Sequence, residues 1–265
     1  MPRQLLTFLL FLSTFLFAQD SRPTAKGFDH SHQGLTALLE RHVHGDRISY
    51  AELREDRAAL GRYLDGLAAV PPAEFAEFTR EQRFAFWINA YNASVLDLIA
   101  RNLPLTSIED LSTKSEKVWK REFVPLGALA PELRKERLSL DDIEHSILRK
   151  EFEDARVHVA VNCASESCPP LRAEAYVAAR LTDQLDEQMR AFIADASRNR
   201  IDARKRELEL SALFDWFAAD FVRDAGSVQA YVQKYAPGSE SDRAWIKSAK
   251  PRFLPYSWKL NELTR

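Results

Sequence analysis

Residues 79–101, TREQRFAFWINAYNASVLDLIAR, predict a long helix that must lie inside the fold. Thr79 can cap this helix together with Gln82, and apolar side chains follow at helical spacing on almost every side. A helix that is apolar all round is buried among other elements. We therefore predict a central helix in a helix-rich α+β domain with a small antiparallel sheet.

Two amides, Asn89 and Asn92, lie three positions apart in this helix and therefore share one side of it. Buried amides must find hydrogen-bond partners. Such partners could be nearby backbone groups, which would make the pair structural. Alternatively, Asn89 could orient a catalytic group and Asn92 could bind an amide of a substrate, and the pattern leaves both interpretations open.

Both cysteines of the chain lie in one stretch, residues 157–171, VHVAVNCASESCPPL. Valines alternate with other residues at its start, which predicts a strand with His158 and Asn162 on the face opposite the valines. The turn CASESCPP then ends the strand, because proline cannot continue a central ladder. Cys163 is thus expected at a strand end, where His158 could reach its thiol if the chain bends back.

The same stretch has a structural interpretation. His158 can be a hydrogen-bonded core histidine, and the spacing of Cys163 and Cys168 allows a disulfide that closes a small loop. If the thiols are free, Cys163 is the candidate nucleophile, and Asn162 and Cys168 are candidates for contact with a substrate.

Residues 138–149, LSLDDIEHSILR, predict a second helix with Ser139 and Asp142 as its capping box. Asp141 and His145 are four positions apart, so they can form a surface ion pair. Glu144 and His145 could instead point toward a site at the helix edge. Further on, residues 207–210 predict a short strand, residues 211–221 a helix, and the tail RFLPYSWKLN an edge strand.

The N-terminal residues 1–18, MPRQLLTFLLFLSTFLFA, predict a secretory signal, with an early arginine, an apolar run and a final alanine. We expect a secreted or periplasmic protein, attached to the membrane only if the signal is retained. The polar residues 19–33 predict a flexible arm, and residues 34–265 a single globular domain.

Charge and motifs exclude several classes of function. The 37 basic and 39 acidic residues give a formal net charge of −2, which offers no strong field for nucleic acid. No glycine-rich nucleotide loop or GxSxG elbow is present, so we predict no cofactor. Four histidines lie close together near the N-terminus, but no acidic or cysteine partner repeats around them, so no metal site is predicted there.

Three motifs occur in the order FAFWINAYNA, SLDDIEHSILR and HVAVNCASESCPPL. In this combination the chain resembles the family called domain of unknown function 547, over roughly residues 80–222. More distantly, this family is similar to the papain and transglutaminase group, whose core packs a central helix against a small sheet. The resemblance implies a papain-like core.

The distant resemblance also implies roles for the candidate residues. Cys163 would be the nucleophile, His158 or His145 the base, and Glu144 or Asn89 the orienting group. This chain departs from the papain pattern, because papain-like enzymes place the cysteine at the start of the central helix. A rearranged site and a lost site are both compatible with that departure.

Three functions follow. The first is a thiol-dependent hydrolase or acyltransferase that acts on amide or thioester bonds of a peptide-like or thiol-containing small substrate. The second is a non-catalytic envelope protein that binds a peptide-like ligand and carries a structural disulfide. The third is a thiol redox site or a zinc site built from Cys163, Cys168, His145 and His158.

Overall fold

The computed structural model describes residues 27–264. The predicted signal, residues 1–18, and most of the predicted arm lie outside these residues. Within residues 27–264, no helix combines the length and the hydropathy needed to cross a bilayer. The end of the predicted arm is packed on the body of the protein: His32 is only 2% exposed, and the ring of Phe28 contacts those of Phe78 and Phe86.

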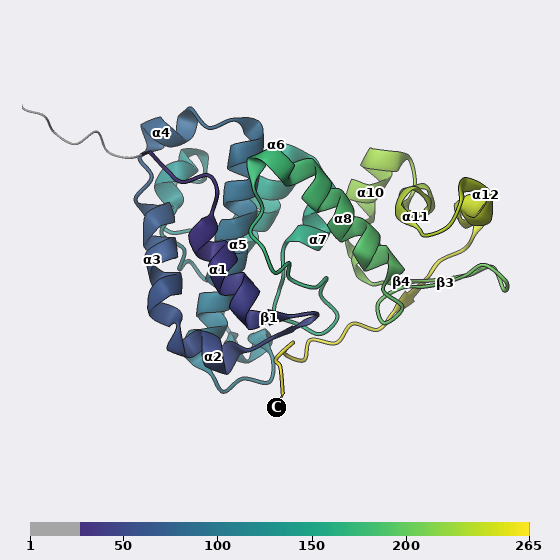
Figure 1. The fold of residues 1–265 in the computed structure, drawn as a ribbon, viewed down its shortest axis with the longest axis horizontal. Coiled ribbons are helices and arrows are strands. Elements are labelled where there is room, and N and C mark those ends of the chain that lie inside the picture. Colours follow the sequence, from purple (N-terminus) through teal and green to yellow (C-terminus); the bar gives the residue numbers. More distant parts are fainter. Residues whose placement is uncertain (1–26, 265) are drawn as a thin grey trace, which may run out of the picture.

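The central helix is α5, Arg80–Asn102, which begins with the predicted capping box of Thr79 and Gln82. Every residue from Phe84 to Ala100 is buried, as expected for a helix that is apolar on all sides. The N-terminal helices are α1 (Gln33–His42), α2 (Tyr50–Glu55), α3 (Arg57–Ala68) and α4 (Pro72–Ala76), with a two-stranded hairpin of β1 (Val43–His44) and β2 (Arg47–Ile48) between the first two. Of these helices, α2 and α3 pack against α5, and α1 packs on α2 and α3 (Figure 1).

After α5 the chain is irregular and forms four short 3₁₀ turns, η1 (Ile108–Leu111), η2 (Val118–Lys120), η3 (Gly127–Leu129) and η4 (Pro131–Leu133). The predicted second helix follows, and its capping box is present: the Asp142 amide donates to Ser139 Oγ at 3.1 Å, and the Ser139 amide donates to Asp142 Oδ2 at 2.8 Å. Its first part, η5 (Asp142–Leu148), is a π-helix that continues into α6 (Arg149–Phe152). Such π-turns often occur at functional sites.

The predicted strand at the start of the cysteine stretch is wrong. Residues Val157–Ala160 form one helical turn, α7, and the chain becomes extended only at Val161. All four residues of α7 are buried, so the alternation of valines does not separate a buried face from an exposed one. The side chain of Asn92 bonds to the backbone on either side of Val161, where a neighbouring strand would otherwise be needed: its Nδ2 donates to Ala160 O at 2.9 Å, and its Oδ1 accepts from the Asn162 amide at 2.9 Å.

The C-terminal part contains more helices and a three-stranded sheet with the order β3-β4-β5. β3 and β4 are antiparallel, whereas β5 runs parallel to β4. The elements are η6 (Ala178–Arg180), α8 (Leu181–Ala194), β3 (Arg200–Asp202), β4 (Glu207–Ser211), α9 (Leu213–Trp216), α10 (Ala218–Ala225), α11 (Val228–Tyr235), α12 (Glu240–Arg243), η7 (Ala244–Ser248) and β5 (Arg252–Leu254). The helix-rich α+β class is therefore confirmed, and the tail does add an edge strand.

Two hydrophobic cores divide the buried side chains. The larger one surrounds α5, and the smaller one lies between α8, β4, α10 and α11. α7 lies at their boundary, because Val157 belongs to the first core and Val159 to the second. After residue 254 the chain runs back from the sheet toward β1 (Figure 1), and Asn261 bonds to Ile48 and Ala164 of the first part.

Candidate functional site

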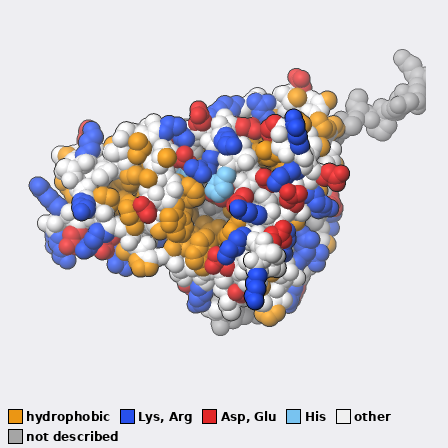
Figure 2. Space-filling model, turned by 180° about the vertical axis from the view of Figure 1, so that it is seen from behind, with side chains coloured by type: hydrophobic (Ala, Val, Ile, Leu, Met, Phe, Trp, Pro, Cys, Tyr) orange, Lys and Arg blue, Asp and Glu red, His pale blue; other side chains and the backbone are white. Residues whose placement is uncertain are grey.

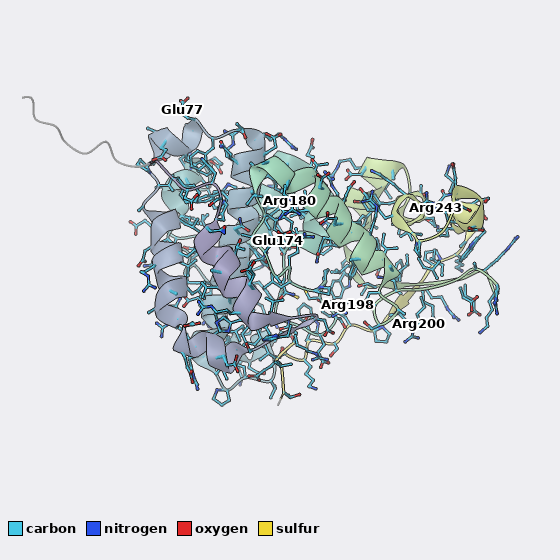
Figure 3. All side chains as sticks on the ribbon, in the orientation of Figure 1. Glu77, Glu174, Arg180, Arg198, Arg200 and Arg243 are labelled. Carbon is cyan, nitrogen blue, oxygen red and sulfur yellow. The ribbon has the colours of Figure 1, made fainter. Side chains whose placement is uncertain are left out.

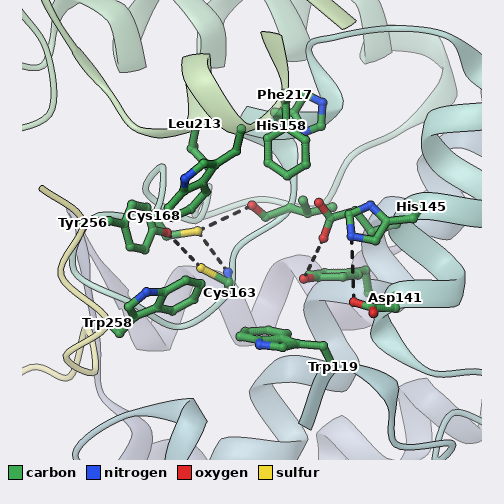
Figure 4. Close-up of a pocket in the computed structure, with 14 residues that line it drawn as sticks. Trp119, Asp141, His145, His158, Cys163, Cys168, Leu213, Phe217, Tyr256 and Trp258 are labelled. Atoms are coloured by element: carbon green, nitrogen blue, oxygen red, sulfur yellow. Dashed lines mark hydrogen bonds and ion pairs between the residues drawn. The ribbon is translucent and has the colours of Figure 1, made fainter. Parts of the chain in front are cut away.

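A cavity of about 310 Å³ lies where the two cores meet (Figure 4). Figure 2 shows the face on which the molecule is hollowed, with hydrophobic side chains around the hollow. Its polar lining comes from η5 and the cysteine turn, and its aromatic lining comes mainly from η2, α9 and the tail. The lining includes Tyr91, Trp119, Asp141, Glu144, His145, His158, Val161, Cys163, Cys168, Leu213, Trp216, Phe217, Tyr256 and Trp258.

Several hydrogen-bond donors surround the sulfur of Cys163. Ser165 Oγ and Tyr256 Oη each lie 3.2 Å from it, and 2.9 Å from each other. Cys168 is the largest cause of a lowered pKa of Cys163, and the two hydroxyls act in the same direction against burial. Burial and the neighbouring sulfur raise the pKa of Cys168. Of the two thiols, Cys163 is therefore the one that ionises first.

Amide side chains hold the turn that carries Cys163. Asn162 Oδ1 accepts from the Ala164 amide at 2.9 Å, and Asn162 Nδ2 donates to Pro169 O at 2.8 Å. Ala164 has a φ of 62°, a left-handed conformation that this network stabilises. Within the turn, the Cys163 amide donates to Cys168 Sγ at 3.0 Å. Asn92, as described above, fixes the approach to the turn.

Arg198 fastens the same turn from outside. It lies between the end of α8 and β3 (Figure 3) and is almost fully buried. Its Nε donates to Cys168 O at 2.8 Å, and one terminal nitrogen donates to Glu166 O at 2.7 Å. Two charge-assisted bonds to backbone carbonyls restrain the turn at its second cysteine. The position of Cys163 is thus set by Asn162 within the turn and by buried side chains from two distant segments, Asn92 and Arg198.

Glu144 lines the cavity from the π-turn. The hydroxyl of Tyr91 donates to Glu144 Oε2 at 3.2 Å. Desolvation is the largest influence on this carboxyl and raises its pKa, and the negative charge of Cys163 adds to that rise. A carboxyl of this kind holds its proton at a higher pH than an ordinary glutamate does, and it can therefore serve as an acid.

His145 lies at the rim of the cavity, with 41% of its side chain exposed. Its Nδ1 is 3.2 Å from a terminal nitrogen of Arg149, and its Nε2 is 3.8 Å from Asp141 Oδ1. Arginine can only donate hydrogen bonds, so Nδ1 must accept, and the proton of the neutral ring is on Nε2. His145 therefore presents a donor, rather than a base, on the side toward Asp141.

His158 is deeply buried behind Phe217, on which its ring stacks with centroids 3.9 Å apart. Its Nε2 lies 2.7 Å from Asp220 Oδ2, and Arg149 Nε donates to the same oxygen at 2.8 Å. Burial lowers the pKa of His158. Asp220 is also partly desolvated, but the bonds from His158 and Arg149 outweigh this and lower its pKa. The other ring nitrogen of His158, Nδ1, has no hydrogen-bond partner among the described residues.

The structure brings together five of the eight predicted site residues. Cys163, Cys168, Glu144, His145 and His158 all line the cavity. No hydrogen bond connects a described histidine with Cys163, so neither histidine is in the position expected of a base for this thiol.

The other three predicted residues, all asparagines, do not line the cavity. Asn89 bonds through both ends of its amide to the backbone of Tyr176, at 2.7 and 3.0 Å. Asn92 and Asn162 hold the cysteine turn in the way described above. In this structure the three amides bond to backbone, as the structural interpretation expects.

Two further expectations are contradicted. Cys163 and Cys168 are free thiols, so the structural disulfide is absent. The proposed zinc ligands do not converge, since no group of three or more His, Cys, Asp or Glu residues in residues 27–264 is arranged to hold a metal ion. The N-terminal histidines form no such group either.

Several residues that surround the thiol were not predicted from the sequence. Ser165 and Tyr256 contact the sulfur directly, and Trp119, Trp216 and Trp258 form much of the wall. The tail sequence PYSW, residues 255–258, is an aromatic cluster in a polar segment, and this was the available signal. Its place next to a cysteine 93 positions earlier depends on the path of the whole chain.

Residues 75–193 match the model of a family described as protein of unknown function, DUF547. No curated protein and no solved structure matches the chain significantly. The matched segment contains all three sequence motifs and the polar lining of the cavity, whereas Trp216, Asp220 and Tyr256 lie beyond it. The segment that is similar to this family holds both cysteines and Glu144.

Proposed function

We propose that the protein is a thiol-dependent hydrolase or acyltransferase with Cys163 as its nucleophile. The observation that carries this proposal is the contact of one sulfur with two hydroxyl groups, next to a second cysteine, at the wall of a cavity. Such donors favour the thiolate, which is the reactive form of cysteine. The predicted signal supports action in the periplasm or outside the cell.

In the first step the Cys163 thiolate attacks the carbonyl carbon of an amide or thioester. A carbon–sulfur bond forms, and the bond to the leaving group breaks as protonated Glu144 gives its proton to the departing nitrogen or sulfur. Glu144 is the proton donor in this proposal, because its pKa is raised and because Nδ1 of His145 is already occupied by its contact with Arg149. The product is an acyl-enzyme and a Glu144 carboxylate.

In the second step water or another acceptor attacks the thioester. The acceptor gives its proton to the Glu144 carboxylate, its new bond to the acyl carbon forms, and the bond to sulfur breaks. The Cys163 thiolate and protonated Glu144 are restored, so the cycle balances. Tyr91 orients Glu144 in both steps through its hydrogen bond.

An acyl-trapping experiment tests this function. Purified protein without residues 1–18 is mixed with p-nitrophenyl acetate, and peptides are examined by mass spectrometry. We expect the wild type to turn over, Glu144→Gln to accumulate acetyl on Cys163, and Cys163→Ala to carry none. Equal acetylation of Cys163→Ala, or acetyl only on lysines, would contradict the proposal.

A thiol redox function is the second candidate, favoured by the contact of the Cys163 amide with Cys168 Sγ at 3.0 Å. Here the Cys163 thiolate would attack a substrate disulfide, and Cys168 would displace the mixed disulfide, which leaves the pair oxidised and the substrate reduced. An external thiol would then reduce the pair. Cys168→Ala separates the two functions: it abolishes the exchange reaction, whereas acetylation of Cys163 is slowed, because Cys168 lowers the pKa of Cys163, but is not lost.

A further inference from the structure

We infer that the cavity binds an organic ammonium group, such as the end of a lysine side chain or an α-ammonium, as the recognised part of the substrate. The role of this cation as substrate rests on the proposed function, whereas its binding does not. The inference comes from the arrangement of aromatic rings and acids in the cavity.

Aromatic faces surround one part of the cavity. Trp258 lies with its ring centroid 5.8 Å from that of Trp119 and 4.7 Å from that of Tyr256, and the planes are inclined by 50° and 53°. Trp216 stacks on Trp258 at 6.0 Å and is 48% exposed. Inclined rings form a curved wall rather than a flat stack. A cation within about 6 Å of several ring centroids is attracted by each of them.

The charged lining is acidic. Figure 4 shows Asp141 and His145 on one side of the cavity and Tyr256 and Trp258 on the other. Asp141 carries a carboxylate, Glu144 carries a carboxyl that is protonated in the resting state of the proposed function, and no lysine or arginine is among the described residues of the lining. A carboxylate ligand would meet these acids and the sulfur of Cys163 without a positive partner, so the site disfavours anions.

The nearest arginine does not change this balance. Arg149 lies over the ring of Phe217, at 5.0 Å from the centroid, and its Nε donates to Asp220. Its other bond is to His145 Nδ1. The guanidinium is thus engaged by Asp220, so the charges that line the cavity itself remain acidic. An ammonium ligand would satisfy both the acids and the aromatic faces.

Recognition and chemistry then come from different segments. Trp216, Tyr256 and Trp258 lie beyond the matched residues 75–193, whereas Cys163 and Glu144 lie within them. The C-terminal segment therefore adds the cation-binding wall to a site whose reactive groups belong to the family segment.

Calorimetry with the Cys163→Ala variant tests the inference without any thiol chemistry. Three ligands of similar size are compared: n-butylammonium, n-butanol and butyrate. We expect butylammonium to bind at least about tenfold more tightly than butanol, as cation–π contacts in a desolvated site allow, and butyrate not to bind. Equal binding of butanol, or binding of butyrate, would overturn the inference.

Variants in the same background locate the cation. Trp258→Leu should lose most of the preference for butylammonium, and Trp258→Phe, which keeps a ring, should restore part of it. Trp245→Phe in η7, outside the cavity, is the matched control and should bind like the parent. If Trp258→Leu fails to fold, Asp141→Asn at the rim replaces it and should weaken butylammonium but not butanol. If every cavity variant keeps the preference for butylammonium over butanol, the cation does not bind in this cavity.

The experiments can contradict the ammonium site and the thiol chemistry independently of each other. If the wild type forms an acyl-enzyme but Cys163→Ala shows no ammonium preference, the inference is wrong and the proposed function remains. If ammonium binds but Cys163 is never acylated, the cavity is a cation-binding site without the proposed chemistry.

Discussion

The two sides of the cavity differ in what they provide. The side formed by residues 75–193 supplies a thiol, a buried carboxyl and the amides that hold them, whereas the C-terminal side supplies aromatic rings and the hydroxyl of Tyr256. Polar groups on the first side are restrained by many hydrogen bonds, while the second side exposes ring faces. A reactive group must be held in position, and a recognition surface need only be complementary in shape and charge. Substitutions on the two sides should therefore have different consequences.

The largest effect is expected at the nucleophile. Cys163→Ala should lower the turnover of an activated ester by about a thousandfold or more, as loss of a catalytic nucleophile does in comparable enzymes. Cys168→Ala, on the same turn, should slow acetylation of Cys163 much less than Cys163→Ala does, because it raises the pKa of Cys163 but keeps the nucleophile; mass spectrometry measures both rates. Equal loss in both variants would mean that the pair acts as one redox unit.

The amides on the reactive side can be tested through stability. Asn92→Ala leaves Ala160 O and the Asn162 amide without their partner, and each buried unsatisfied group costs about 1 to 3 kcal/mol of unfolding free energy. Asn102→Ala, at the exposed end of the same helix, is the control and should cost much less. Urea denaturation measures both values, and similar losses would contradict a specific role for Asn92.

Among the described C-terminal residues, Tyr256 is the one that hydrogen-bonds to the Cys163 sulfur. Tyr256→Phe removes a hydrogen bond that stabilises the thiolate, so the pKa of Cys163 should rise and its alkylation at pH 7 should slow by about tenfold. Ammonium binding should change little, because the ring is kept. A variant that alkylates like the wild type would show that Tyr256 belongs to the recognition side alone.

The smallest effect is expected behind the cavity, at His158. Its folded pKa is below the ordinary value of 6.5, so the unfolded chain takes up a proton first as the pH falls. The stability that comes from this histidine is present above pH 6.5 and is lost as the pH falls toward the folded pKa. His158→Gln should be less stable at pH 7.5 but should lose less stability between pH 7.5 and 5. Thermal denaturation at pH 7.5 and pH 5 measures the stability of both proteins. If wild type and His158→Gln lose the same stability between these pH values, His158 is not the cause of the pH dependence.

Local features could be predicted from the sequence. The capping boxes at Thr79 and Ser139 and the burial of α5 depend on residues within a few positions of each other. The alternation of valines from residue 157 predicted a strand, which is wrong. The segment forms the helical turn α7, all four residues of which are buried. Apolar periodicity reports which face is buried only when another face is exposed.

The site was predicted only in its sequence-local parts. Cys163, Cys168, Glu144 and His145 belong to short motifs, so their candidacy could be read directly from the chain. The roles of Tyr256 and Trp258 could not, because they depend on a tail that returns from the sheet to the cysteine turn. For Asn89 and Asn92 the sequence left both a structural and a chemical role open, because a buried amide looks the same in sequence whether it binds backbone or substrate.

The alkylation rate of Cys163 against pH tests the central claim most directly. The signal-less protein is labelled with iodoacetamide without reductant, and labelling of Cys163 and Cys168 is followed separately by mass spectrometry. Because its pKa is lowered and that of Cys168 is raised, Cys163 should label first, with a midpoint below the ordinary thiol value of about 8.5. If Cys163 labels only above that value, or if both cysteines are protected until a reductant is added, the activated thiol does not exist and the account is wrong.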